Sequence, residues 1–303
     1  MKFLLGLVVV FGSVIGGFVL SHGHVLAIWQ PVELIIICGA ATGAFIIANP
    51  TKTIKATLAS FSGILKGSKY NKALCLELLA LLFDIGTKIR KSGLMSLEQD
   101  LDAPEGSTLF SNAPHLVKDH HFMNFLSDNL RVLVTGNLQV HEFESLLDQE
   151  LEVHHHESQQ PVEALSRLAD AMPGFGIVAA VLGIVVTMAL IGGDPKQLGV
   201  HIAAALVGTF MGILLSYGFI GPMSLSVASN VAKEAAFYQC VKVFLLSVAS
   251  GAAPMLTVEY ARRTLASDMK PGFLELEEHV KKKPGQTAAT PEADPASTPP
   301  PAE

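Results

Sequence analysis

Eleven histidines are the side chains of this 303-residue sequence best suited to bind a metal or carry a proton near neutral pH. Three of them, His154, His155 and His156, are consecutive. Adjacent helix positions point in different directions, so a consecutive triplet is a poor metal cage. We interpret the triplet as a solvated polar stretch. No Walker loop and no GxSxG, HExxH or CxxC motif is present, so we expect neither an enzyme nor a cofactor.

The cysteines and the net charge likewise indicate no binding site. The cysteines Cys38, Cys75 and Cys240 are odd in number and far apart, which fits no disulfide framework and no metal spacing. We interpret each as a small buried apolar residue. A net charge of −6 argues against nucleic-acid binding.

Charge is scarce because several long stretches have none. Charged residues make up 16% and hydrophobic residues 50% of the chain, whereas soluble proteins carry about 25% charged residues. Four stretches are long enough to cross a lipid bilayer as helices. They lie at about 3–20, 34–50, 172–192 and 200–222.

Two apolar stretches allow another interpretation. The first span could be a cleaved signal peptide, but its apolar stretch is long and a second span follows at once. The stretch 243–258 is short and is interrupted by Gly251 and Pro254. We expect it to be a buried or interfacial helix rather than a fifth span.

Lysine and arginine indicate the orientation, because they concentrate on the cytoplasmic side. Segment 49–170 carries eleven and the part after Pro222 carries eight, whereas loop 21–33 has none and loop 192–199 has only Lys196. Both termini are therefore expected in the cytoplasm.

The expected fold is an all-α membrane protein with four transmembrane helices in two hairpins and a large helical cytoplasmic domain. Its predicted parts are a hairpin at 1–50, a cytoplasmic helical domain at 51–170, a hairpin at 171–222, a C-terminal helical region at 223–280 and a disordered tail at 281–303. A helix beginning near Pro161 is expected to run into the third span. The fourth span is expected to continue past Pro222 into the cytoplasm.

No predicted span carries Asp, Glu, Lys or Arg at depth, although proton relays in membranes usually need such a group. Spans three and four carry small and weakly polar residues instead, which let helices approach closely. They are Gly174, Gly176, Ala179, Ala180, Gly183, Thr187, Gly208, Thr209, Gly212 and Ser216. These small residues have two possible roles. They serve plain helix packing, or they form a face that receives a partner helix supplying a carboxylate, in which case Thr209 would offer a hydroxyl to the ion.

Two further pairs of residues could have mechanical roles. Pro173 and Pro222 lie at the expected cytoplasmic ends of spans three and four, as helix punctuation or as hinges. Arg90 and Glu98 flank Gly93 in a polar turn, as ordinary solvated charges or as a docking face for a charged partner.

Several stretches together resemble the proton-type MotA family of flagellar stator subunits, within the MotA/TolQ/ExbB proton channel superfamily. They are QPVELIIICGAATGAFIIANP, SKYNKALCLELLALL, MPGFGIVAAVLGIV, ALVGTFMGILLSYGFIGP, QCVKVFLLS and PGFLELEEHV. The resemblance covers nearly the whole chain apart from the Pro-rich tail. It implies a bacterial inner-membrane protein that forms a ring of five around two copies of MotB. The MotB transmembrane helix would bring the missing Asp, and protons rather than sodium would drive torque on the rotor.

The resemblance also implies roles for individual residues. Pro173 and Pro222 match the family's functional prolines, and Ala180 and Thr209 match ion-path positions. Gly176 and Thr187 are expected on the same partner-facing surface. Arg90 and Glu98, with Glu150, match charges that engage the rotor protein FliG. Asp84 and Gly86 depart from the family, because a more basic segment is usual there.

Two alternatives stay open. An ExbB- or TolQ-like energiser of outer-membrane transport would share spans three and four, but usually has three spans and an outside N-terminus. A membrane scaffold without ion flux fits the acid-free spans equally well.

Overall fold

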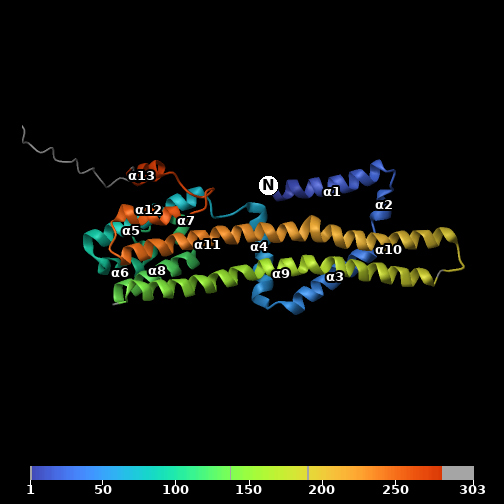
Figure 1. Cartoon of the computed structure of the whole chain (residues 1–303), viewed down its shortest axis with the longest axis horizontal. Helices are drawn as coiled ribbons and strands as arrows, with labels where there is room; N and C mark the ends of the chain where they lie inside the picture. The colour runs from blue at the N-terminus through green and yellow to red at the C-terminus, as the bar shows by residue number, and fades with distance from the viewer. Residues whose placement is uncertain (1, 137, 190, 282–303) are drawn as a thin grey trace, which may run out of the picture.

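Two long helical rods run side by side along most of the molecule (Figure 1). The computed structural model describes residues 2–136, 138–189 and 191–281. The first rod is α9 (Val140–Met188). The second is α10 (Pro195–Leu215), which continues through a five-residue π-helix, η3 (Ser216–Ile220), into α11 (Gly221–Ala249). We call the end where α9 stops and α10 begins the hairpin tip.

Four helices are long and apolar enough to cross a membrane. They are α1 (Lys2–Leu20), the pair α2 (Val25–Ile28) and α3 (Pro31–Ala48), the apolar part of α9, and α10. Pro31 and Pro195 each stand in the first turn of their helix, where proline's fixed φ and missing N–H suit the backbone. These helices form the membrane half of the chain.

The amphipathic helix α4 (Thr51–Lys66) crosses the two rods steeply where the membrane half ends (Figure 1). Lys52 bonds Glu157 of α9 at 2.7 Å, and the Thr53 hydroxyl donates to the Gln160 side chain at 2.9 Å. Helix α3 ends just before Pro50 because the residue preceding a proline disfavours the helical conformation.

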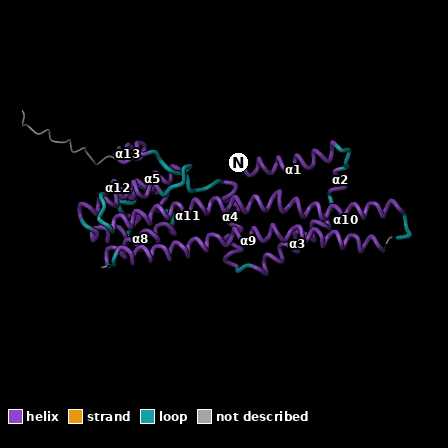
Figure 2. The backbone as a smooth tube through the Cα atoms, viewed as in Figure 1, coloured by secondary structure: helices purple, strands orange, loops and turns teal. Residues whose placement is uncertain are grey.

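The other half, which we call the helical domain, gathers short helices around the far ends of the rods. They are α5 (Lys72–Ser92), η1 (Leu94–Leu97), α6 (Glu98–Asp102), η2 (Pro104–Gly106), α7 (Pro114–Val117), α8 (His120–Thr135), α12 (Pro254–Arg263) and α13 (Phe273–Lys281). The backbone trace shows helices and loops, with no strand in the described residues (Figure 2). The predicted all-α fold with four spans is confirmed.

The domain core is aromatic. The Phe237 ring lies 5.1 Å from Tyr70, 5.6 Å from Phe122 and 6.0 Å from Tyr238, between ring centroids. Phe244 and Leu245 are fully buried in the same cluster. Stretch 243–258 is therefore core and not a span, because α11 ends at Ala249 and the chain turns at Gly251 with φ of 74°.

One expected boundary is wrong. The helix leading into the third span begins at Val140 rather than near Pro161. A capping box between Gln139 and Glu142 starts it, and buried Pro161 stays inside because packing on both sides outweighs one lost backbone bond. The expected disordered tail lies outside the described residues except for Lys281.

Candidate functional site

Helices α9 and α10 approach so closely that two of their glycines have no room for a side chain. A Cβ on Gly176 would lie 3.0 Å from the Gly208 carbonyl oxygen and 3.1 Å from the Gly212 Cα. A Cβ on Gly212 would lie 2.8 Å from the Gly176 Cα. These contacts involve backbone, which cannot swing away. We call this line of contact, with Ala180 and Thr209, the small-residue seam.

Three of the predicted ion-path residues lie on this seam. Gly176 is buried, and Ala180 and Thr209 are half-buried. A Cβ on Gly208 would lie 3.4 Å from the Ala180 backbone nitrogen, so α10 meets α9 at that level. Thr187 is seven residues beyond Ala180 along α9, which places it about 10 Å closer to the hairpin tip than Ala180. Its buried hydroxyl donates to the Gly183 carbonyl at 2.7 Å, so its own helix already engages it.

The second span of the structure begins earlier than predicted and includes an acid that precedes the predicted span 34–50. Glu33 lies in the first turn of α3 and is only 8% exposed. Its Cγ would lie 3.4 Å from a Cβ on Gly208, and its Oε2 has no hydrogen-bond partner in the described part of the chain. In the sequence, Glu33 directly precedes the apolar stretch 34–50. Pro31, a residue typical of a helix start, was the signal that the helix begins before it.

The two predicted hinge prolines lie where helical hydrogen bonding is interrupted. Pro173 is inside α9, so the Ala169 carbonyl lacks its usual donor four residues on. Pro222 follows η3 directly, where the Gly221 N–H donates to the Ser216 carbonyl in the wider π pattern. A proline at 222 cannot bond the Gly218 carbonyl, and the wider turn accommodates its ring. Sequence reasoning found the prolines but not the π-helix.

The predicted rotor-facing charges are exposed but not all together. Arg90 ends α5 and Glu98 begins α6, on either side of Gly93, whose φ is 80°. Neither forms a salt bridge within the described residues. Glu150 is on α9, where its carboxylate accepts a hydrogen bond from the Asn129 side chain at 2.8 Å. The structure gives no contact between Glu150 and the turn that holds Arg90 and Glu98.

The histidine triplet is only partly solvated. His155 and His156 are exposed, but His154 is half-buried, with its ring 4.5 Å from Tyr238 and its Nε2 3.8 Å from Glu234. Tyr70 donates to the same Glu234 carboxylate at 2.7 Å, and burial beside it raises the pKa of Tyr70. Within the described residues no three His, Cys, Asp or Glu side chains form a metal cluster.

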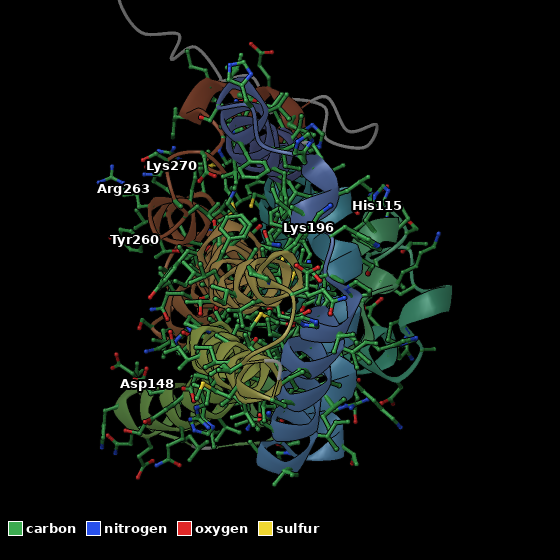
Figure 3. All side chains as sticks on the ribbon, turned by 90° about the vertical axis from the view of Figure 1, so that its right-hand side faces the viewer. His115, Asp148, Lys196, Tyr260, Arg263 and Lys270 are labelled. Carbon is green, nitrogen blue, oxygen red and sulfur yellow. The ribbon has the colours of Figure 1, made fainter. Side chains whose placement is uncertain are left out.

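Ion pairs join the two rods to each other and stabilise α12 locally. Lys242 of α11 is nearly buried and bonds Asp148 of α9 at 2.6 Å. Asp148 lies at the edge of the molecule when it is viewed along its length (Figure 3). In α12, two hydrogen bonds from Arg262 and one from Arg263 lower the pKa of Glu259 to about 2.

Four apolar spans and a second half built on the same rods define a multi-pass membrane protein. Two family models match: Motility protein A N-terminal at residues 4–93, and the MotA/TolQ/ExbB proton channel family at residues 117–239. The chain is similar to Motility protein A of Salmonella typhimurium and of Escherichia coli, each 43% identical over 97% of this chain and 100% of the relative.

Further relatives agree. Chemotaxis protein LafT of Vibrio parahaemolyticus is 36% identical over 94% of this chain and 100% of its own length. The fold is similar to that of C. jejuni MotAB, with a TM-score of 0.72, 20% identity and coverage of 88% of this chain and 96% of that one. The chain belongs to the motility protein A family. Like these relatives, it is a flagellar stator subunit rather than an enzyme, and the comparisons favour this role over an energiser.

Proposed function

We propose that this stator subunit conducts protons together with a MotB-type partner and converts their flow into torque on the rotor protein FliG. Five copies would surround two partner helices in the inner membrane, with both termini and the helical domain in the cytoplasm. The partner would supply an aspartate opposite Ala180 and Thr209.

The observation that carries this proposal is the continuity of the two rods. α9 runs unbroken from the helical domain to the hairpin tip, and α10, η3 and α11 form one continuous rod beside it. A shift in packing at the small-residue seam is therefore transmitted to the domain without an intervening loop. Pro173 and η3 are positions where the rods can bend, because Pro173 has no backbone donor and η3 departs from the α-helical hydrogen-bond pattern.

The spans leave apolar faces on which a partner helix and neighbouring copies could pack. In the membrane half of α9, Ile177, Val181 and Val185 are between 52% and 61% exposed. Leu206 of α10 is 67% exposed. Such faces are stable only against lipid or other helices.

The hinge role is tested by swimming. We expect a strain carrying Pro173→Ala together with Pro222→Ala to assemble stators and lose motility, because alanine restores the backbone donors and stiffens both rods. Pro195→Ala is the matched control, since Pro195 is in the first turn of α10, where a missing N–H has no effect. Normal swimming of the double variant would reject the hinges.

The ion-conducting role is tested separately. The chain is co-expressed with a partner from which any plug segment has been removed, and proton entry is measured with an internal pH indicator. We expect conductance well above that of the partner alone. Conductance at background would leave a membrane scaffold as the function.

A further inference from the structure

The same four-residue pattern, Gln-x-x-Glu, begins two helices of this chain and has two different outcomes. At the start of α9 the Gln139 backbone N–H donates to the Glu142 carboxylate at 3.0 Å, and the capping box is complete. At the start of α3, Gln30 and Glu33 have the same spacing but form no capping box. The ordinary structural role of a glutamate at this position therefore does not account for Glu33.

Glu33 instead points into the place where three helices meet. Helix α3 packs on both α9 and α10. The Glu33 side chain lies against Gly208, which is itself in contact with Ala179 and the Ala180 backbone. The carboxyl group thus lies beside the small-residue seam, next to residues that the proposed ion path uses.

Glu33 forms no salt bridge within the described part of the chain, so no ion pair there compensates the buried acid. In the packed stretches 31–48, 171–188 and 195–215, the other titratable side chains are Cys38, Lys196 and His201. Lys196 is exposed near the hairpin tip (Figure 3), about 18 Å along α10 from Gly208. His201 is half-buried and lies on the same face of α10 as Gly208, two turns or about 10 Å toward the tip.

A buried carboxyl oxygen without a partner is costly, and inside a membrane such a group usually marks an ion pathway. Within the described residues nothing completes the hydrogen bonding of the Glu33 Oε2, which leaves this oxygen free to bind a proton or water. A Cβ on Gly208 would lie 3.4 Å from the Glu33 Cγ, so the lack of a side chain at Gly208 is what lets Glu33 lie against α10.

We propose that Glu33 is a proton-binding residue of the ion path. Its carboxylate takes a proton from water entering on the His201 side and becomes a carboxylic acid. It then returns that proton to water at the level of Ala180 and Thr209, where the partner's carboxylate accepts it. The inference rests on the proposed function, because it needs a proton path along α9 and α10.

The decisive variant is Glu33→Gln, which keeps the size and hydrogen-bonding capacity of the side chain but cannot bind and release a proton. Glu33→Asp retains the chemistry on a shorter side chain. Glu142→Gln is the matched control, since it alters the glutamate of the same motif that only caps a helix. Each variant is co-expressed with the plug-free partner, and complex yield and proton conductance are measured.

We expect Glu33→Gln to assemble at the wild-type level and to lose conductance several-fold. Glu33→Asp should recover part of it, and Glu142→Gln should conduct as the wild type does. A difference infrared spectrum of the purified complex should contain a pH-dependent carboxylic acid band that Glu33→Gln removes and Glu142→Gln leaves.

Each contrary result has a distinct meaning. Wild-type conductance in Glu33→Gln, or an unchanged infrared band, overturns this inference and leaves the proposed function standing. Failure of Glu33→Gln to assemble makes Glu33 a packing residue and also overturns it. A wild-type complex that conducts no protons rejects the proposed function itself.

Discussion

In the helical domain α11 packs through Phe237, Tyr238 and Phe244, whereas in the membrane half α10 packs through Gly208 and Gly212. The domain fills its interior with large aromatic rings, which gain stability by leaving water. The membrane helices gain little from burial in lipid, so they rely on close backbone contact between small residues.

This contrast explains why the two halves differ in completeness. The domain core is closed within one chain. The membrane half leaves apolar side chains such as Ile177 and Val185 more than half exposed. The domain core is therefore closed without other chains, whereas the apolar faces of the membrane half must be covered by lipid or by other helices.

The largest expected effect is a loss of stability when a large side chain is removed from the aromatic core. Phe237→Ala should lower the free energy of unfolding by about 3–5 kcal/mol, because it leaves a cavity among Tyr70, Phe122 and Tyr238. Phe273→Ala, at a side chain that is 45% exposed, should change it little. Thermal unfolding of the purified chain in detergent measures both, and equal effects would show that the core is not closed.

Acid should weaken the domain through Glu259. Arg262 and Arg263 hold the pKa of Glu259 at about 2 in the folded chain, against about 4.3 when unfolded. The stabilisation is complete above about pH 4.3 and is lost as the pH falls toward 2. Because Arg263 is exposed, we expect a loss of only about 2 kcal/mol.

Glu259→Gln separates this contribution from general acid unfolding. The variant should be less stable than the wild type at pH 7 and should lose less stability between pH 4.3 and 2. Urea unfolding at several pH values measures the difference. An identical pH dependence in both proteins would show that the Arg262 pair contributes nothing.

The membrane half should fail through crowding rather than through a cavity. Gly176→Ala places a methyl group against the backbone of α10 and should cost about 1–3 kcal/mol, with loss of motility. Gly174→Ala is two residues away on the same helix, where a Cβ meets open space. Swimming assays and complex yields should separate the two variants, and equal behaviour would argue that the seam is loose.

The smallest expected effect concerns the pair between Lys242 and Asp148. Asp148→Ala leaves a nearly buried ammonium without its main partner, whereas Lys242→Met leaves an aspartate that is 59% exposed and can hydrate. Asp148→Ala should therefore be the more destabilising, by about 1 kcal/mol. Comparing the thermal unfolding of the two variants measures this, and the reverse order would mean that water reaches Lys242.

Local patterns were sufficient for the fold and for part of the site. Stretches of about 20 apolar residues can satisfy their backbone in a bilayer only as helices, which determined the four spans. Small residues on spans three and four predicted the small-residue seam. The prolines predicted where the backbone hydrogen bonding of the rods would be interrupted. Thr187 was placed on the same face, but its hydroxyl turned back to Gly183.

The sequence by itself therefore determined the apolar helices and the residues able to pack closely. Only the tertiary structure decided what those residues face. In the tertiary structure Glu33 lies against Gly208, whereas Glu142 of the same motif caps a helix. The local sequence of a helix start does not determine which other helices pack against it. It wound residues 216–220 as a π-helix, whose wider turn accommodates the ring of Pro222.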